Sequence, residues 1–157
     1  MNQAIKLFLK ESVELELNVA ELYQLFSVKF PRDYHFWWKI SLEEMNHAAL
    51  IDSINDFFFT ETILPFGELE RYTEEIHQIN LNIKARTELY KTIPPTRSEA
   101  FNYGFELENS AGESHYEFFM TSELISEPMG KVFQKLNGDD INHAKRIEKY
   151  RRENNIV

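Results

Sequence analysis

The chain has 157 residues, and its 26 acidic and 17 basic side chains give it a net charge of −9 at neutral pH. This length suits one domain, 1–157, with a full hydrophobic core, and the acidic balance argues against nucleic acid and anionic membrane surfaces as partners. The sequence contains no cysteine, which excludes disulfides, thiolate catalysis and cysteine-bound clusters. A metal site must therefore use carboxylates, imidazoles or water.

The N-terminal segment resembles neither a signal peptide nor a membrane helix. Charges at Lys6, Lys10 and Glu11 interrupt it too early for the apolar region of a signal peptide. No apolar run approaches the roughly 18 residues that a membrane helix needs. We therefore expect a cytoplasmic protein.

Helical periodicity fills the segments between a few well-separated proline turns. No segment alternates with a period of two for long enough to form a strand. The expected class is all-α, with four long helices and a fifth inside the connection between the second and third of them. The expected helices span residues 2–28, 33–59 with Asp33 as N-cap, 67–91, 96–122 with Thr96 or Ser98 as N-cap, and 127–153.

An internal repeat divides the chain into two similar halves. "ELELNVAELY" (14–23) aligns with "ELENSAGESH" (106–115), with four identities in ten positions. "LEEMNHAALI" (42–51) aligns with "GDDINHAKRI" (138–147), with four identities and with acid matching acid at two further positions. Each half therefore reads as a helical hairpin that carries a lone Glu and then an acid-x-x-His.

Helical phase selects which glutamates face inward. The neighbours of Glu16 and Glu108 at three, four and seven positions are mostly apolar or small, which predicts buried carboxylates. Glu106 has mainly polar neighbours and should face solvent. The same test predicts a solvated face around Glu14, whose neighbours include Lys10, Glu11, Asn18 and Glu21.

The selected acids also lie at matching levels along the bundle. Glu16 and Glu44 are each fourteen residues from a turn near residue 30, or roughly 21 Å at about 1.5 Å per residue. Glu108 and Asp140 are likewise each sixteen residues from the midpoint of their connection. Acids at one depth on antiparallel helices can converge on one point.

Four carboxylates and two imidazoles without thiols match a pair of cations such as iron, manganese or a mixture of the two. One Glu from each of two helices and a Glu-x-x-His from each of the other two is the ligand pattern of di-iron and di-manganese bundles. The alternative is a bundle whose buried acids and histidines only hydrogen-bond one another. The candidate ligands are Glu16, Glu44, His47, Glu108, Asp140 and His143.

Several neighbouring residues have less certain roles. Glu74 and His77 form another E-x-x-H with polar neighbours, which predicts an ordinary solvated face. His35 is expected to be structural. Tyr23 and His115 are candidate hydrogen-bond partners of the ligands, although the sequence favours ordinary packing for both.

The second acid-x-x-His motif has two interpretations. Asn137 and Gly138 could begin a new helix, which would make Asp139 or Asp140 a helix cap instead of a ligand. The apolar positions on both sides of the glycine keep one helical phase, which favours a continuous or locally kinked helix.

Together these motifs resemble the rubrerythrin branch of the ferritin-like superfamily. "ELNVAELY" resembles the first-helix pattern of that family, and "EEMNHA" and "DDINHA" resemble its E-x-x-H helices. The resemblance covers nearly the whole chain and implies a ferritin-like four-helix bundle with a long crossover, two irons, and oxygen or peroxide chemistry. Asp140 departs from the family pattern by replacing Glu. The family's rubredoxin-like cysteine cluster is missing, so electrons must come from a separate donor.

Three functions remain open from the sequence. The first is a di-iron oxidoreductase that reduces peroxide or dioxygen. The second is a ferroxidase or iron-handling protein, and the third is a non-catalytic, metal-stabilised helical bundle that acts through partners. The oligomeric state is also open, with a homodimer as one candidate.

Overall fold

The structure is a computed structural model that describes residues 3–57, 66–110 and 127–156. These ranges are helical apart from short connections and contain no strand, which confirms the all-α class. No helix within them is long and apolar enough to span a lipid bilayer. In chain order the elements are α1 (Gln3–Lys29), the 3-10 turn η1 (Pro31–Asp33), α2 (Tyr34–Phe57), α3 (Phe66–Thr92), α4 (Arg97–Ser110) and α6 (Glu127–Glu153).

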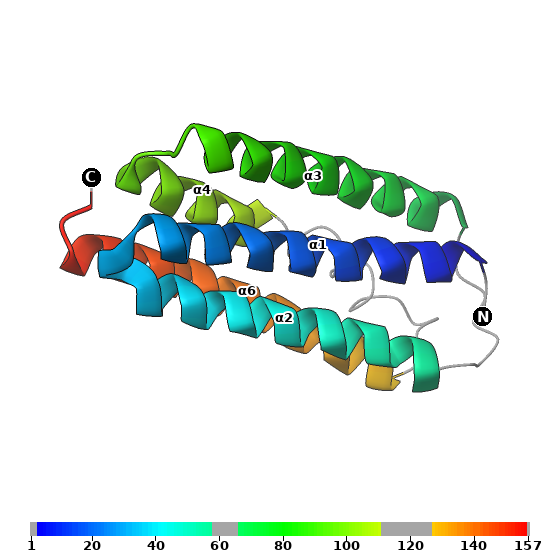
Figure 1. Cartoon of the computed structure of the whole chain (residues 1–157). Helices are drawn as coiled ribbons and strands as arrows, with labels where there is room; N and C mark the ends of the chain where they lie inside the picture. The colour runs from blue at the N-terminus through cyan, green and yellow to red at the C-terminus, as the bar shows by residue number, and fades with distance from the viewer. Residues whose placement is uncertain (1–2, 58–65, 111–126, 157) are drawn as a thin grey trace.

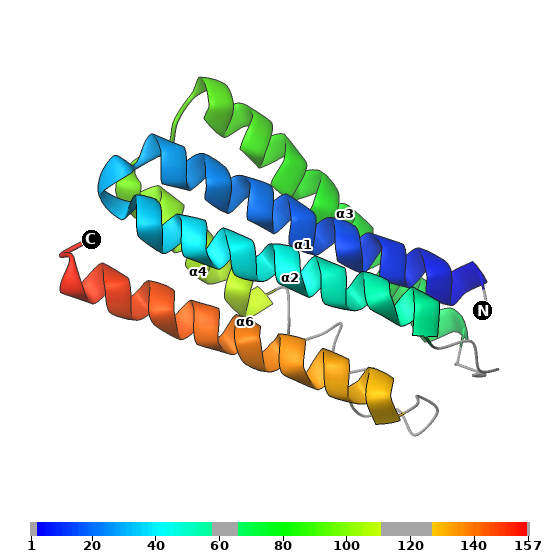
Figure 2. The same cartoon turned by 60° about the horizontal axis from the view of Figure 1, so that its bottom comes forward.

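The helices lie side by side as two antiparallel pairs, α1 with α2 and α4 with α6 (Figure 1). The pairing of α4 with α6 follows from its contacts, because the later α4 residue Glu108 meets the earlier α6 residue His143. Phe101, which comes before Glu108 in α4, stacks on Tyr150, which comes after His143 in α6. Helix α6 also runs antiparallel along α2 (Figure 2).

Helix α3 follows α2 and precedes α4 in the sequence, and it carries the chain back along the length of the bundle. It runs parallel to α1, since Glu11 contacts His77 near one end and Glu21 contacts Lys91 near the other (Figure 1). The extra helix expected in this connection is therefore present. At 27 residues it is as long as α1.

The face of α1 that meets α3 is polar and partly buried: Lys10 and Glu21 are exposed and Glu14 is half-exposed, as predicted, but two of its residues are not. Glu11 and Asn18 are each only 7% exposed. The Asn80 amide donates to the Glu11 carboxylate at 3.1 Å, and the Asn18 amide donates to Asn80 at 2.8 Å. His77 approaches the same carboxylate at 3.2 Å. The prediction was wrong for Glu11 and Asn18, because a polar pattern does not reveal that another helix covers it. We call Glu11, Asn18, His77 and Asn80 the α1–α3 polar cluster.

Large aromatic side chains fill the core near η1. Tyr23, Trp37 and Phe101 are fully buried in it. Gly104 lets the backbone of α4 approach this core, because a Cβ at that position would lie 3.0 Å from Cη2 of Trp37 and 3.4 Å from Cε1 of Tyr23. A larger residue at this position would therefore press on the Trp37 ring.

Asp33 joins three elements at this end of the bundle. Its buried carboxylate accepts two hydrogen bonds from the Arg97 guanidinium, at 2.7 and 2.8 Å, and a third from the Tyr150 hydroxyl at 3.1 Å. Asp33 does stand directly before α2, as predicted, but these bonds occupy its carboxylate. A bidentate, charge-assisted pair of this kind fixes geometry as well as adding stability.

Two predicted helix boundaries are settled by the structure. Thr96 caps α4 as predicted, since its hydroxyl accepts from the Glu99 backbone N–H while the Glu99 carboxylate accepts from Thr96. Helix α6 continues unbroken through Asn137 and Gly138, so the interpretation of Asp140 as a helix cap is wrong. The predicted end of the fourth helix near residue 122 lies outside the described residues.

Candidate metal centre

All six predicted ligands come together in the middle of the bundle. Helices α1 and α4 each supply one glutamate, and α2 and α6 each supply an acid and a histidine one turn apart. Their side chains are buried, with between 2% and 6% of each residue exposed. The residues are Glu16 on α1, Glu44 and His47 on α2, Glu108 on α4, and Asp140 and His143 on α6.

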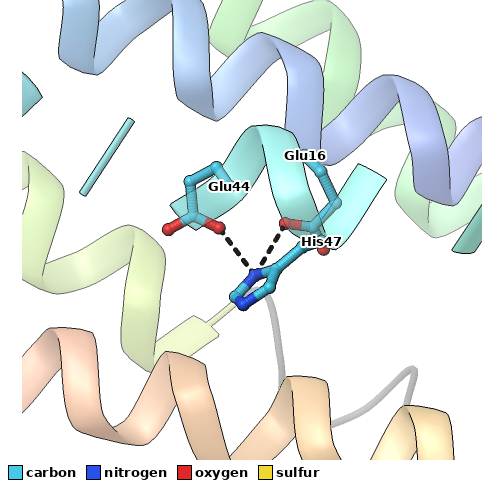
Figure 3. Close-up of side chains that lie close together, drawn as sticks. All are labelled: Glu16, Glu44 and His47. Atoms are coloured by element: carbon cyan, nitrogen blue, oxygen red, sulfur yellow. Dashed lines mark hydrogen bonds and ion pairs between the residues drawn. The ribbon is translucent and has the colours of Figure 1, made fainter. Parts of the chain in front are cut away.

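The first half of the site surrounds His47. Its Nδ1 lies 3.0 Å from Oε2 of Glu44 and 3.6 Å from Oε2 of Glu16, so both carboxylates point at the same edge of the ring (Figure 3). Asp140 reaches the same nitrogen from α6, with its Oδ1 at 3.7 Å. Three helices thus direct oxygen and nitrogen ligands toward one small volume.

The second half surrounds His143 in a similar way. Its Nδ1 lies 2.7 Å from Oε1 of Glu44 and 3.3 Å from Oε2 of Glu108. Glu44 therefore turns one oxygen toward each histidine. The two imidazole rings are nearly parallel, at an angle of 17°, with their centroids 5.5 Å apart.

Two atoms at the centre of this arrangement lack hydrogen bonds to any residue that the structure describes. Oε1 of Glu44 and Nδ1 of His143 are buried and close, yet their alignment does not satisfy either of them. Leaving such groups unsatisfied in a protein interior is costly. A cation that both atoms coordinate would satisfy them, so the donor set fits a bound metal.

The outer nitrogen of each histidine faces an acid from the opposite motif. Nε2 of His143 lies 2.8 Å from Glu43, which is also bonded by Arg146 at 2.5 Å. Nε2 of His47 lies 3.4 Å from Asp139, which pairs with Lys135. Such contacts fix the ring orientation and the tautomer of a metal-binding histidine.

Sequence reasoning missed this role of Glu43 and considered Asp139 only as a helix cap. The signal was present in the repeat, where Glu43-Glu44 aligns with Asp139-Asp140. The inner acid of each pair, Glu44 or Asp140, points into the site. The outer acid, Glu43 or Asp139, reaches the histidine of the other helix.

Protonation equilibria reflect the crowding of acids. Although burial opposes it, the carboxylates of Glu16 and Glu44 raise the pKa of His47 to about 11. Burial likewise opposes protonation of His143, but Glu108 and Glu44 raise its pKa to about 11. Burial and the charges of neighbouring acids raise the pKa of Asp140 well above its usual value. The metal-free site therefore holds protons that bound cations would displace.

A polar cavity of about 330 Å³ opens beside the histidines, between α2 and α6. Its lining includes both histidines and the outer acids Glu43 and Asp139. Burial raises the pKa of Glu43, but Arg146 and His143 outweigh burial and lower it overall. The cavity thus provides a charged approach to the outer edges of both rings.

Tyr23 bonds a candidate ligand directly. Its hydroxyl donates to Oε1 of Glu108 at 2.5 Å and lies 3.4 Å from the Gly104 carbonyl. Burial and the nearby acids raise the pKa of Tyr23 well above its usual value, so the phenol remains a donor. The other candidate partner, His115, lies outside the described residues.

The remaining predicted residues lie away from the site. Glu74 is exposed and bonds Gln78, whereas His77 is half-buried beside Glu11 in the α1–α3 polar cluster. His35 is exposed in the first turn of α2. Neither histidine lies near the six candidate ligands.

Comparison with known proteins adds no family assignment. No family model, curated protein or solved structure matches the chain. The site therefore stands on its own geometry: two groups of buried residues, Glu16–Glu44–His47 and Glu44–Asp140–His143, that could each hold a metal ion.

Proposed function

We propose that this protein is a di-iron carboxylate oxidoreductase, similar to rubrerythrin and built on a ferritin-like bundle, that reduces peroxide or dioxygen. One observation carries the proposal: Glu44 lies between His47 and His143 and offers each half of the site one carboxylate oxygen. Glu44 would therefore hold one cation with each of its carboxylate oxygens.

The donor set supports two cations of the iron or manganese class. In each of the two groups the potential ligand atoms lie within 4.8 Å of one another, and Glu44 belongs to both. Glu108 completes the second group from α4 through its contact with His143. Oxygen and imidazole donors without thiols suit iron or manganese. Bound here, two irons would supply reversible electron transfer to the oxygen–oxygen bond.

The surrounding residues position the ligands and limit water. Tyr23 holds one oxygen of Glu108, while Glu43 holds the outer nitrogen of His143. Leu15, Val19 and Leu107 form an apolar wall beside the carboxylates. Such a wall excludes competing water from the reacting centre.

The helix order supports the ferritin-like part of the proposal. Helices α1 and α2 form one antiparallel pair, α4 and α6 form the other, and α3 makes a single long crossover between them. One long crossover is the connection expected for ferritin-like bundles.

The test follows iron oxidation and iron content together. Protein loaded with ferrous ion is mixed with hydrogen peroxide under anaerobic conditions. We expect rapid oxidation that stops at about two irons per chain and resumes after re-reduction. Uptake of many ferric ions per chain would instead indicate iron storage. Absence of oxidation would leave a metal-stabilised bundle without redox function.

A further inference from the structure

Aromatic rings connect the candidate metal centre to the η1 end of the bundle. We propose that Tyr23, Trp37 and Tyr150 form a relay that carries single electrons from the protein surface to the metal pair. This inference rests on the proposed redox function, because the metal pair is the oxidant that the relay serves.

Tyr23 forms the inner end of the relay. Its hydroxyl is 2.5 Å from the Glu108 carboxylate, so the phenol is one hydrogen bond away from a proposed ligand. Its ring centroid lies 5.1 Å from that of Trp37. Tyr23 thus contacts both the metal centre and the next oxidisable side chain.

Two phenylalanines join Trp37 to Tyr150. The Phe101 centroid lies 4.5 Å from Trp37 and 5.5 Å from Tyr150, with the Phe101 and Tyr150 rings parallel to within 1°. Phe36 makes a second connection, with centroids 5.3 Å from Trp37 and 4.2 Å from Tyr150. One layer of rings therefore separates the two oxidisable groups.

Tyr150 forms the outer end. It is half-buried, so part of the residue is accessible to solvent. Its hydroxyl donates to Asp33 at 3.1 Å, which gives the phenol a proton acceptor. Arg97 binds the same carboxylate and keeps it in position.

The indole of Trp37 favours a relay over simple packing. Within the described ranges its Nε1 is buried without a hydrogen-bond partner, a cost that a phenylalanine would avoid. The missing acceptor also means that an oxidised indole keeps its N–H proton. The electron vacancy would then pass on instead of becoming trapped at Trp37.

Reduction of dioxygen to two water molecules takes four electrons, of which two ferrous ions would supply two, so the relay supplies the other two, one at a time. Tyr23 loses one electron toward the metal centre, and its phenol proton moves to Glu108, leaving a neutral tyrosyl radical. Trp37 then gives one electron to Tyr23, which recovers its proton from Glu108. The indole is left as a radical cation.

The outer steps restore the relay from solution. Tyr150 gives one electron to Trp37 and its phenol proton to Asp33. A one-electron reductant in solution then reduces Tyr150, which recovers the proton from Asp33. The net result is transfer of one electron from the reductant to the metal pair.

Freeze-quench electron paramagnetic resonance tests the relay. Ferrous-loaded protein is mixed with oxygen-saturated buffer, and ferric absorbance records metal oxidation separately. We expect a transient tyrosyl signal in the wild type and its loss in Tyr23→Phe protein that has been loaded to the same iron content. In Tyr150→Phe, radical decay in the presence of ascorbate should slow by about tenfold.

Tyr34→Phe is the matched control. Tyr34 is an exposed tyrosine at the same end of the bundle, and its ring contacts are with His35 and Trp38 instead of the relay. The control should show wild-type signal and decay. Metal oxidation without a radical that depends on Tyr23, or decay unaffected by Tyr150→Phe, would overturn the relay alone. Absence of metal oxidation would overturn the proposed function and the relay with it.

Discussion

Glu11 and Glu16 are both buried on α1, five residues apart, but their surroundings differ. Glu11 faces α3, where the Asn80 amide donates to its carboxylate and His77 lies close by. Glu16 faces the other side of the helix, toward His47 and a group of further acids. Both regions contain a buried glutamate and a histidine, yet only the second contains a concentration of acids.

The difference teaches which feature marks a metal centre. Burial of an acid is not sufficient, because neutral amides can satisfy a single carboxylate, as they do at Glu11. At the candidate centre, acids from four helices instead face two histidines, and His143 Nδ1 and Glu44 Oε1 remain unsatisfied. A cation is the group that relieves both problems.

The largest expected effect separates these two regions. Glu44→Gln should abolish binding of about two metal equivalents, because the shared carboxylate loses its charge and one donor oxygen. Glu11→Gln should retain wild-type metal content. Elemental analysis and titration with ferrous ion measure both variants. Equal metal loss in the two variants would show that the distinction is wrong.

A smaller effect is expected at the outer acids. Glu43→Gln should weaken metal binding by about 10–100-fold while leaving the six ligands in place, because Glu43 orients His143. Glu21→Gln is the control, since it changes a glutamate in an exposed ion pair with Lys91. If Glu43→Gln bound metal like wild type, the contact with His143 would have no orienting role.

The metal-free protein should lose stability as pH rises. Folded Asp140 retains a proton that the unfolded chain releases near pH 4, and the histidines retain protons up to about pH 11 against about 6.5 when unfolded. Raising pH through these ranges therefore favours unfolding. Asp140→Asn should make the dependence shallower and stabilise the metal-free chain at pH 7 by about 1 kcal/mol.

Calorimetry of metal-free protein between pH 5 and pH 9 measures both effects. The same variant should bind metal more weakly, so its metal affinity and its metal-free stability should change in opposite directions. Glu11→Gln provides the comparison, because it removes a buried carboxylate that already accepts a hydrogen bond from Asn80. A rise in metal-free stability with pH would contradict the retention of protons by Asp140, His47 and His143 in the folded state.

The smallest effect is expected outside both regions. Glu74→Ala removes the acid of the third E-x-x-H, which is exposed and accepts a hydrogen bond from Gln78. Its free energy of unfolding should change by less than about 0.5 kcal/mol, and its metal content should not change. Thermal unfolding and elemental analysis test this expectation.

Regular helical geometry explains why the ligand positions could be predicted. Periodicity fixed the direction of Glu16 and Glu108, and residue counts from each turn fixed their level along the bundle axis. The repeat then paired the acid-x-x-His motifs of α2 and α6. These arguments depend only on distances within a hairpin, which the sequence determines well.

Features that depend on contacts between distant helices could not be predicted in this way. The sequence pattern around Glu11 is polar, and nothing in it shows that α3 covers that face. Glu43 has the pattern of a surface acid until α6 places His143 opposite it. The close approach of Gly104 to Trp37 likewise requires the packed bundle.

The length of α3 has a mechanical consequence for the site. Helices α1 and α3 each contain 27 residues and run in parallel, so each spans about 40 Å. The length of α3 therefore sets where α4 begins. Through α4 it also sets the position along the bundle axis at which Glu108 meets His143. Removing one helical turn from α3 would displace that starting point by about 5.4 Å, more than the 3.3 Å that separates Glu108 from its histidine.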